Sequence, residues 1–260
     1  LKFNELTDVS LLSRLPRLKH LSLQKNQSIR ISTLSEIKTI ELLGLNDCQL
    51  TDIEPLAKLK GLRSLWLMRN QLSDISHLAG LKQLEGLYLA KNNISDISCL
   101  ANLKQLKKIL LTNNQISDIS PLSGLDQLEG LQISTNTLSS VSPLANLTQL
   151  KELTIAGNQI ADAGPLMNLV NLKKLSLSKN KLSDVNSLAK LKQLEELYLS
   201  GNNLSEVKPL AELTQLKTLQ LAYNKLTDIS PLEGLEKLEE LSLSGNQLVE
   251  IESLGELTEL

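Results

Sequence analysis

The chain has 260 residues, of which 41% are hydrophobic and only 2% are aromatic, so any core must be built mainly from leucine and isoleucine. Its formal net charge is −2, from 27 basic and 29 acidic residues, which gives no indication of general binding to nucleic acid or to an anionic membrane. The sequence predicts neither a membrane span nor a signal peptide, and two cysteines make no disulfide framework.

A repeat of 22 residues runs along the whole chain and predicts one elongated domain of about twelve coils over residues 1–260. Each coil carries L-x-x-L-x-L-x-x-N, as in Leu106, Ile109, Leu111 and Asn114, followed by apolar residues two, five, eight and eleven positions later. Cys48 fills the one position where the asparagine is missing. The recurring asparagines are Asn4, Asn26, Asn70, Asn92, Asn114, Asn136, Asn158, Asn180, Asn202, Asn224 and Asn246.

Each complete L-x-L segment is expected to form a short strand with one buried face, because the leucines alternate with variable residues. A single coil cannot bury its own apolar side, whereas stacked coils bury a continuous leucine core. The pattern therefore predicts a parallel sheet. Its expected strands are 21–23, 43–45, 65–67, 87–89, 109–111, 131–133, 153–155, 175–177, 197–199, 219–221 and 241–243.

The recurring asparagine suits the turn that leaves the strand, because its side chain can satisfy backbone groups in the turn and in neighbouring coils. Cys48 keeps the small size and a weak donor but loses the strong acceptor. We expect a local weak spot in the asparagine ladder at this coil.

The return segment of each coil contains S-D-I-S-P-L or a variant of it, as at 117–122. Serine before proline is typical of a helix N-cap and the first helical position. Since only about ten residues remain before the next strand, the helix is expected to be a short 3₁₀ turn. Strands on one side and 3₁₀ turns on the other, of unequal width, would bend the stack into a horseshoe.

This pattern resembles the leucine-rich repeat family, and the unbroken period with S-D-I-S-P-L looks like its bacterial internalin-type and phosphatase-regulator-type subclass. The resemblance covers essentially the whole chain. It implies an α/β solenoid, with a concave parallel sheet and short 3₁₀ turns on the convex side. One coil departs from the pattern: Ser28 follows Asn26 at the apolar position and Ile29 is displaced by one, which affects the turn there.

The aromatic residues occupy variable strand positions and avoid the leucine columns. In "LRSLWLMRN", for example, Trp66 alternates with Leu65 and Leu67 and should point away from the core. The five aromatic residues are Phe3, Trp66, Tyr88, Tyr198 and Tyr223.

Trp66, Met68, Tyr88 and Leu110 lie on three consecutive expected strands, about 4.8 Å apart, and form the predicted partner-binding patch. Basic residues surround this patch: Arg63, Arg69, Lys91 and Lys108. Small residues beside Tyr88, at Gly86 and Ala90, are expected to leave its ring accessible or to make a shallow pocket. The alternative is that neighbouring rings simply cover one another. A second candidate patch consists of Tyr198, Gln220 and Tyr223.

Charged residues after the first leucine of each motif alternate in sign from coil to coil, which predicts a ladder of ion pairs that fixes the register. The alternation slips where Lys151 precedes Lys173, a small basic spot that could accept an acidic partner. The aspartate four residues after most asparagines is expected to bond to its own turn rather than to calcium.

No catalytic or ligand-binding motif is visible in the sequence. His20 and His77 occupy different parts of the coil, so no metal site is predicted, and Cys48 and Cys99 should not meet. No Ser/His/Asp set, phosphate-binding glycine loop or acid/base pair appears. We therefore predict no cofactor and no enzymatic activity, and a protein or peptide partner rather than a nucleic acid, a small molecule or a membrane.

The chain begins and stops inside a strand motif, without the polar caps that solenoids need, so both end coils should expose leucine and the sequence is expected to be part of a longer protein. A non-enzymatic interaction module on the concave sheet is the first functional prediction. The alternative is the regulatory arm of a larger signalling protein, such as a Roco-type GTPase, or a phosphatase regulator. Resemblance to internalins implies a cell-surface or secreted setting for the first, and a signalling arm would be cytoplasmic.

Overall fold

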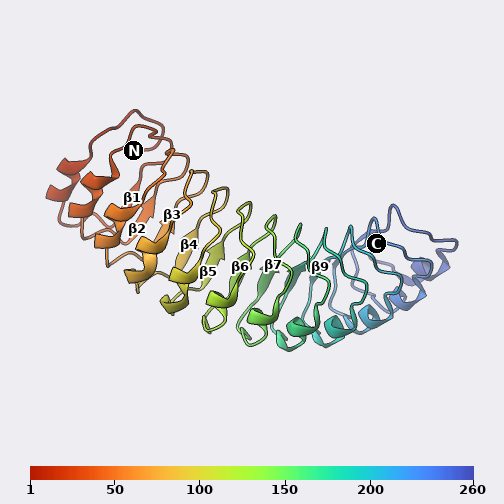
Figure 1. The fold of residues 1–260 in the computed structure, drawn as a ribbon. Helices are drawn as coiled ribbons and strands as arrows, with labels where there is room; N and C mark the ends of the chain where they lie inside the picture. The colour runs from red at the N-terminus through yellow and green to blue at the C-terminus, as the bar shows by residue number, and fades with distance from the viewer. The chain divides into compact units, whose positions relative to one another are not determined.

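The structure is a computed structural model that describes residues 1–260, apart from the side chain of Glu256. The chain comprises two compact units, Leu1–Leu128 and Glu129–Leu260, and each is described by itself. In both units the coils contribute short strands along one side and 3₁₀ helices along the other, and only the first coil lacks a strand (Figure 1). That the chain forms a single domain stays a prediction.

The strands of each unit pair in parallel with their neighbours in sequence, and every Cα partner lies one repeat away, as in Leu43 with Leu65. They begin one residue earlier than predicted, because the residue before each first strand leucine already joins the ladder. The first unit holds β1 (His20–Ser22), β2 (Leu42–Gly44), β3 (Ser64–Trp66), β4 (Gly86–Tyr88) and β5 (Lys108–Leu110). The second holds β6 (Gly130–Gln132), β7 (Glu152–Thr154), β8 (Lys174–Ser176), β9 (Glu196–Tyr198), β10 (Thr218–Gln220) and β11 (Glu240–Ser242).

The return segments form 3₁₀ helices of three to six residues, as predicted. In the first unit these are η1 (Ser10–Arg14), η2 (Ile31–Glu36), η3 (Glu54–Lys58), η4 (Ser76–Gly80), η5 (Ser98–Asn102) and η6 (Ser120–Leu122). In the second they are η7 (Ser142–Leu144), η8 (Gly164–Asn168), η9 (Asn186–Lys190), η10 (Lys208–Glu212), η11 (Ser230–Leu232) and η12 (Glu252–Glu256). Nowhere in the described residues is a helix long and apolar enough to cross a membrane.

The predicted serine N-cap of these helices is wrong. In η6 the N-cap residue is Ile119, which makes no side-chain capping bond, and Ser120 is already helical. The first free N–H, that of Ser120, donates instead to Oδ1 of Asp118 at 2.8 Å. The recurring aspartate therefore satisfies the helix N-terminus, which confirms that it bonds to its own turn.

The fold should lose stability in acid because several of these exposed carboxylates are ionised more easily in the folded chain. The backbone hydrogen bond from the serine two residues later lowers the pKa of Asp8, Asp74, Asp118 and Asp228. A lowered folded pKa stabilises the fold above the unfolded pKa, and this contribution is lost as pH falls through the folded value. We expect a thermal midpoint that is steady from pH 7 to 5 and falls below about pH 4.

Circular dichroism melts across this range would measure the loss. Asparagine at these four positions keeps an oxygen acceptor but does not titrate, so the fourfold variant should show a flatter acid limb than the parent. An identical acid limb in the two proteins would contradict a role for these bonds.

The core is a stack of aliphatic side chains, one layer per coil. Leu65 and Leu67 are fully buried, while Trp66 between them is only half-buried on the opposite face of β3. The predicted phase of the strands is therefore confirmed. We call the other face the sheet face: it carries the side chains at positions 20, 22, 24 and 25 and at the equivalent positions of the other coils.

The asparagine ladder is present in both units and links neighbouring coils within each of them. Asn70 donates from Nδ2 to the carbonyl of Leu67 in its own coil and to that of Leu45 in the preceding coil, both at 2.9 Å. Its Oδ1 accepts the N–H groups of Cys48 and Leu50, each at 3.0 Å. Asn92, Asn158, Asn180, Asn202 and Asn224 repeat this pattern of donation at the same spacing.

Cys48 performs half of this role. Its Sγ donates to the carbonyls of Leu23 and Asn46, both at 3.4 Å, and the first of these is the bond to the preceding coil that an asparagine would make. The thiol offers no strong acceptor for the N–H groups of the turn in the preceding coil, which follows Asn26. That turn is the irregular one, where the N–H of Ile29 bonds to the carbonyl of Asn26.

The residue just before each asparagine position adopts the left-handed backbone conformation. Glycine occupies three of these sites, with φ between 67° and 72°. The other nine carry side chains at φ between 54° and 61°, a conformation that costs a non-glycine residue about 1–2 kcal/mol. These nine are Phe3, Lys25, Asp47, Arg69, Lys91, Asn113, Thr135, Lys179 and Tyr223.

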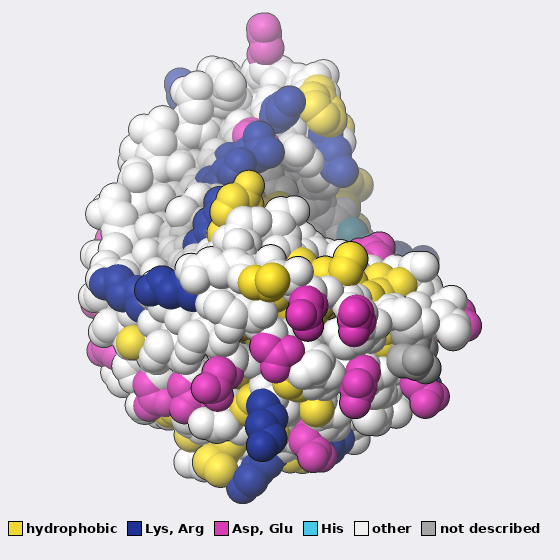
Figure 2. All heavy atoms as spheres, turned by 90° about the vertical axis from the view of Figure 1, so that its right-hand side faces the viewer, with side chains coloured by type: hydrophobic (Ala, Val, Ile, Leu, Met, Phe, Trp, Pro, Cys, Tyr) yellow, Lys and Arg dark blue, Asp and Glu magenta, His cyan; other side chains and the backbone are white. Residues whose placement is uncertain are grey.

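Large hydrophobic side chains are exposed in the first and last coils, as predicted. In the first unit they include Leu1, Leu11 and Leu15, and in the second Val249, Ile251 and Leu260. Figure 2 faces the C-terminal end and shows hydrophobic side chains interspersed with acidic ones there.

Candidate functional site

The rings of Trp66 and Tyr88 stack on each other on the sheet face of the first unit. Their centroids are 5.1 Å apart and their planes differ by 3°. The stack follows from the register, since the two residues are Cα partners on β3 and β4. Both side chains remain half-buried, so the rings cover each other on one side only.

The ring of Tyr88 also lies across Gly86. A Cβ atom added to Gly86 would stand 3.1 Å from Cε2 and 3.2 Å from the hydroxyl oxygen of Tyr88. The tyrosine turns along its own strand and fills the space at Gly86, so this space is not the expected shallow pocket, while the side chain itself stays only half-buried. A larger residue at this position would require the ring to move by a few tenths of an ångström.

The open space lies at Gly44 instead, one strand before Trp66. A hollow of about 510 Å³ opens there on the sheet face, and Trp66 and Met68 form part of its lining. Gly44 is the Cα partner of Trp66, and a Cβ atom added to it would stand 3.1 Å from Oγ of Ser22 on the preceding strand. The other lining residues come from neighbouring coils: Lys2, His20, Leu21, Ser22, Gln24, Leu42, Gly44 and Asn46.

Sequence reasoning missed His20 and Leu42, which both line this hollow. They occupy the first strand position, two residues before Ser22 and Gly44. Period 2 along the strand places positions 20, 22 and 24 on one face, so this column could have been read with the others.

The four apolar residues of the predicted patch lie on adjoining strands. Met68 follows β3, and its N–H donates to Oδ1 of Asn46 at 2.8 Å, which holds the chain at the edge of the hollow. Leu110 is the Cα partner of Tyr88 on β5 and is half-buried. The residues Trp66, Met68, Tyr88 and Leu110 are called the aromatic patch below.

The four basic residues around the aromatic patch fall into two kinds. Arg63 forms an ion pair with Glu85, with 2.9 Å between Nη1 and Oε1. Arg69, Lys91 and Lys108 are exposed, and the structure describes no ion pair for any of these three. Arg69 and Lys91 both occupy left-handed positions.

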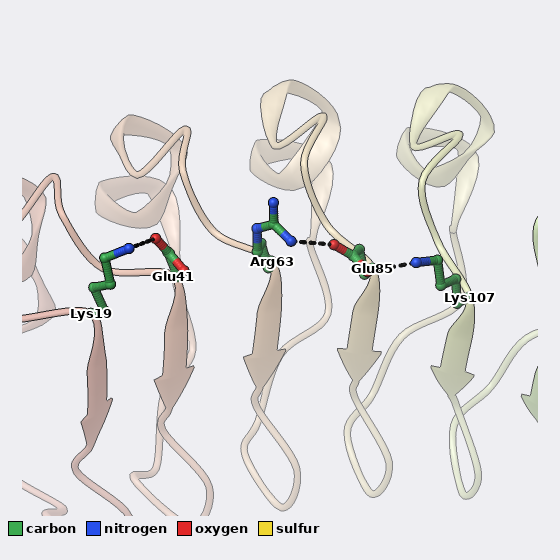
Figure 3. A network of polar contacts seen from close by, with 5 residues as sticks. All are labelled: Lys19, Glu41, Arg63, Glu85 and Lys107. Atoms are coloured by element: carbon green, nitrogen blue, oxygen red, sulfur yellow. Dashed lines mark hydrogen bonds and ion pairs between the residues drawn. The ribbon is translucent and has the colours of Figure 1, made fainter.

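The ion-pair ladder is present in both units. In the first unit Lys19 pairs with Glu41 at 2.7 Å, and Glu85 lies between Arg63 and Lys107, 2.8 Å from the latter (Figure 3). The hydrogen bond from Lys107 lowers the pKa of Glu85. These side chains are largely exposed, so each pair contributes little to stability and acts mainly on register.

The basic spot predicted at the slip in the ladder is neutralised by neighbours. Lys151 pairs with Glu129 at 2.7 Å, and Lys173 pairs with Glu195 at 3.1 Å. Glu195 also accepts Lys217, at 3.3 Å.

The three residues of the second candidate patch have different surroundings. The hydroxyl of Tyr198 donates to Oε2 of Glu196 at 2.7 Å, which also pairs with Lys174, and this bond raises the pKa of Tyr198. The Lys174 ammonium lies 5.3 Å from the tyrosine ring. Tyr223, by contrast, is 70% exposed and its ring lies against Gly245. Gln220 is the Cα partner of Tyr198.

No metal-binding or reactive cluster emerges among the described residues. No group of three or more His, Cys, Asp or Glu side chains there could hold a metal. Burial raises the pKa of Cys99 to about 12 and also raises that of Cys48, so neither thiol is activated as a nucleophile. Both cysteines are free.

The two units differ in charge. Residues 1–128 contain 16 Lys and Arg against 12 Asp and Glu, a net charge of +4. Residues 129–260 contain 11 against 17, a net charge of −6. The near-neutral total therefore conceals a basic unit, and that unit is the one with the aromatic patch.

Models of the family described as leucine-rich repeats match residues 38–80, 82–124, 170–212 and 214–257 in pairs of repeats, and a further leucine-rich repeat model matches 104–160. No curated protein matches the chain. Two solved structures bind ligands: a plant receptor kinase ectodomain in complex with CASPARIAN STRIP INTEGRITY FACTOR 2, 25% identical, and a TLR13 complex with single-stranded RNA, 26% identical. The chain spans 38% and 37% of their lengths, with TM-scores of 0.73 for both, so fold likeness does not exclude nucleic acid as a partner.

Similar solved structures from bacteria cover almost the whole chain. A leucine-rich repeat protein of Leptospira interrogans is 27% identical, with a TM-score of 0.84 over 99% of this chain and 74% of that one. The internalin InlF of Listeria monocytogenes is 36% identical, with a TM-score of 0.96 over 99% of this chain and 76% of that one. The chain therefore belongs to the leucine-rich repeat family, among its bacterial internalin-like members.

Proposed function

We propose that the chain is a non-enzymatic recognition module that binds a protein or peptide on the sheet face of its first unit. Its fold is typical of protein–protein interaction modules. Beyond what the fold indicates, we propose that the aromatic patch anchors the partner and that the chain catalyses no reaction.

The observation that carries the proposal is the stacked pair Trp66 and Tyr88, of which Trp66 lines an open hollow. Binding energy at protein interfaces is concentrated in a few Trp, Tyr and Arg residues that fill or border pockets. A stacked pair loses little conformational freedom when a partner docks, because each ring already fixes the other. Exposed Arg69, Lys91 and Lys108 surround the pair in the manner of a polar rim.

Replacing both rings, Trp66→Ala with Tyr88→Ala, should abolish the binding of peptide ligands selected on the full chain. We expect each substitution to weaken binding by about 2 kcal/mol or more, since each removes a large anchor. Short random peptides displayed on phage and panned against the parent protein provide the ligands. Fluorescence anisotropy of the labelled synthetic peptides measures their affinity.

Val170→Ala is the matched control, because Val170 is an exposed apolar residue of the second unit. It should bind the selected peptides as the parent does. Circular dichroism would verify that the double variant stays folded at the temperature of the assay. Selected peptides that bind the folded double variant with parent affinity would refute the proposed site.

A further inference from the structure

We propose that the partner segment on this face is acidic and carries one large apolar side chain, which enters the hollow at Gly44. This inference rests on the proposed function and names the chemistry of its ligand. It is drawn from three independent features of the first unit: the charge of the sheet face, the backbone conformation that displays this charge, and the shape of the hollow.

The sheet face of the first unit carries five lysine or arginine side chains and one carboxylate. The carboxylate is Asp47. The basic residues are Lys2, Lys25, Arg69, Lys91 and Lys108, and all five are exposed. His20 adds a further nitrogen donor at the hollow. An electropositive surface of this kind favours the approach of an acidic segment and selects against a basic one.

Three of these basic residues occupy positions where the backbone favours glycine. Lys25, Arg69 and Lys91 have φ of 60°, 55° and 61°. In the second unit the same column contains Gly157, Gly201 and Gly245. Glycine would therefore fit the turns of the first unit without strain, and long basic side chains are present there in spite of the backbone. Strained side chains of this kind are common where a surface serves a ligand.

The hollow supplies the apolar component of recognition. Trp66, Met68 and Leu42 give it apolar walls, and Gly44 contributes no side chain to it. Ser22, Gln24 and Asn46 add polar groups that can bond to the backbone of a bound segment. With a volume of about 510 Å³, the hollow has room for a leucine or an aromatic side chain together with the backbone that carries it.

An acidic peptide fits these features better than a single-stranded nucleic acid does. Nucleic acids bind along successive exposed rings on which bases stack. Here Trp66 and Tyr88 stack on each other, and Asp47 follows β2 on the sheet face, where a phosphate backbone would meet its charge. A peptide can place its carboxylates beside the basic residues and a single apolar side chain at Gly44.

The test uses the full chain and the panned peptides. We expect the enriched peptides to carry net negative charge and at least one large apolar residue, and their affinity to fall as salt concentration rises. The double variant Arg69→Gly with Lys91→Gly should bind them at least about tenfold more weakly, because it removes two rim charges. Gly44→Leu, which places a side chain in the hollow, should weaken the binding of these peptides by a similar factor.

Lys179→Gly is the matched control, because Lys179 occupies the same left-handed column in the second unit, at φ 54°. Like the Arg69 and Lys91 variants, it should raise the denaturant midpoint of unfolding, since glycine relieves the backbone. Unlike them, it should leave peptide affinity unchanged. Glycine should therefore stabilise the fold in both units but weaken peptide binding only in the first. A purely structural role of Arg69 and Lys91 would not give this combination.

Three outcomes would overturn the inference, and they differ in what they leave standing. Peptides that need Trp66 and Tyr88 but are not acidic, or that bind the Arg69 and Lys91 double variant at parent affinity, would refute the acidic partner and leave the proposed function intact. A short single-stranded RNA that binds the aromatic patch more tightly than any peptide would replace the peptide with nucleic acid. The absence of any peptide that depends on Trp66 and Tyr88 would overturn both proposals.

Discussion

Leu65→Ala is expected to lower the free energy of unfolding by about 3 kcal/mol, whereas Trp66→Ala, at the next residue, should lower it by only about 1 kcal/mol. Leu65 is fully buried among the aliphatic layers, so its truncation leaves a cavity that the stacked coils on either side cannot close. Trp66 loses mainly its stacking contact with Tyr88. Urea unfolding monitored by circular dichroism measures both variants.

The comparison is sharp because the smaller residue has the larger effect. A volume argument alone would give the opposite order, since tryptophan is the larger side chain. Equal losses, or a greater loss at Trp66, would mean that the strand is out of phase with its assignment and that the aromatic patch belongs to the core.

Asn70→Ala should be the most damaging polar substitution in the first unit, with a loss of about 3 kcal/mol. It leaves the N–H groups of Cys48 and Leu50 without their acceptor, and the carbonyls of Leu45 and Leu67 without their donor. Asn70 is itself buried, so water does not readily replace these bonds. Thermal and urea unfolding would both report the change.

Cys48→Ala provides the comparison within the same ladder. It removes two long bonds from sulfur and no acceptor, so its cost should be about 1 kcal/mol. If the two substitutions were equally damaging, the asparagine oxygen would not be the important group, and the predicted weak spot at Cys48 would have no basis.

The sequence was sufficient to predict the fold because the repeat leaves few alternatives. Leucine recurs at every second strand position and asparagine once per repeat, so the position of a residue in the repeat predicts whether its side chain is buried. The buried leucines and the ladder bonds of Asn70 agree with this prediction. The serine N-cap failed because the helix begins one residue earlier than a serine cap requires. Ser120 is already helical, and Asp118 accepts its N–H on Oδ1 and its hydroxyl on Oδ2.

The candidate site was predicted less completely, for a different reason. The columns located Trp66 and Tyr88, but the side of the stacked rings on which a hollow opens depends on a side-chain rotamer. Tyr88 turns onto Gly86 and fills that space, whereas no ring reaches Gly44. A periodic pattern fixes the face on which a side chain lies, and not the direction in which it leans along that face.

The asparagine bonds also give each unit a direction. Every ladder asparagine that bonds to a second coil reaches back to the preceding one, as Asn92 does in bonding to the carbonyl of Leu67 and the N–H of Leu72. A coil's turn is therefore completed by a residue that the chain has not yet supplied when that coil is synthesised. When a C-terminal coil is pulled away, the turn of the coil before it loses its bonds to the departing asparagine. When an N-terminal coil is pulled away, the turn of the coil after it keeps its bonds, because its asparagine comes from the coil that follows. Resistance to unravelling should thus depend on which end is pulled.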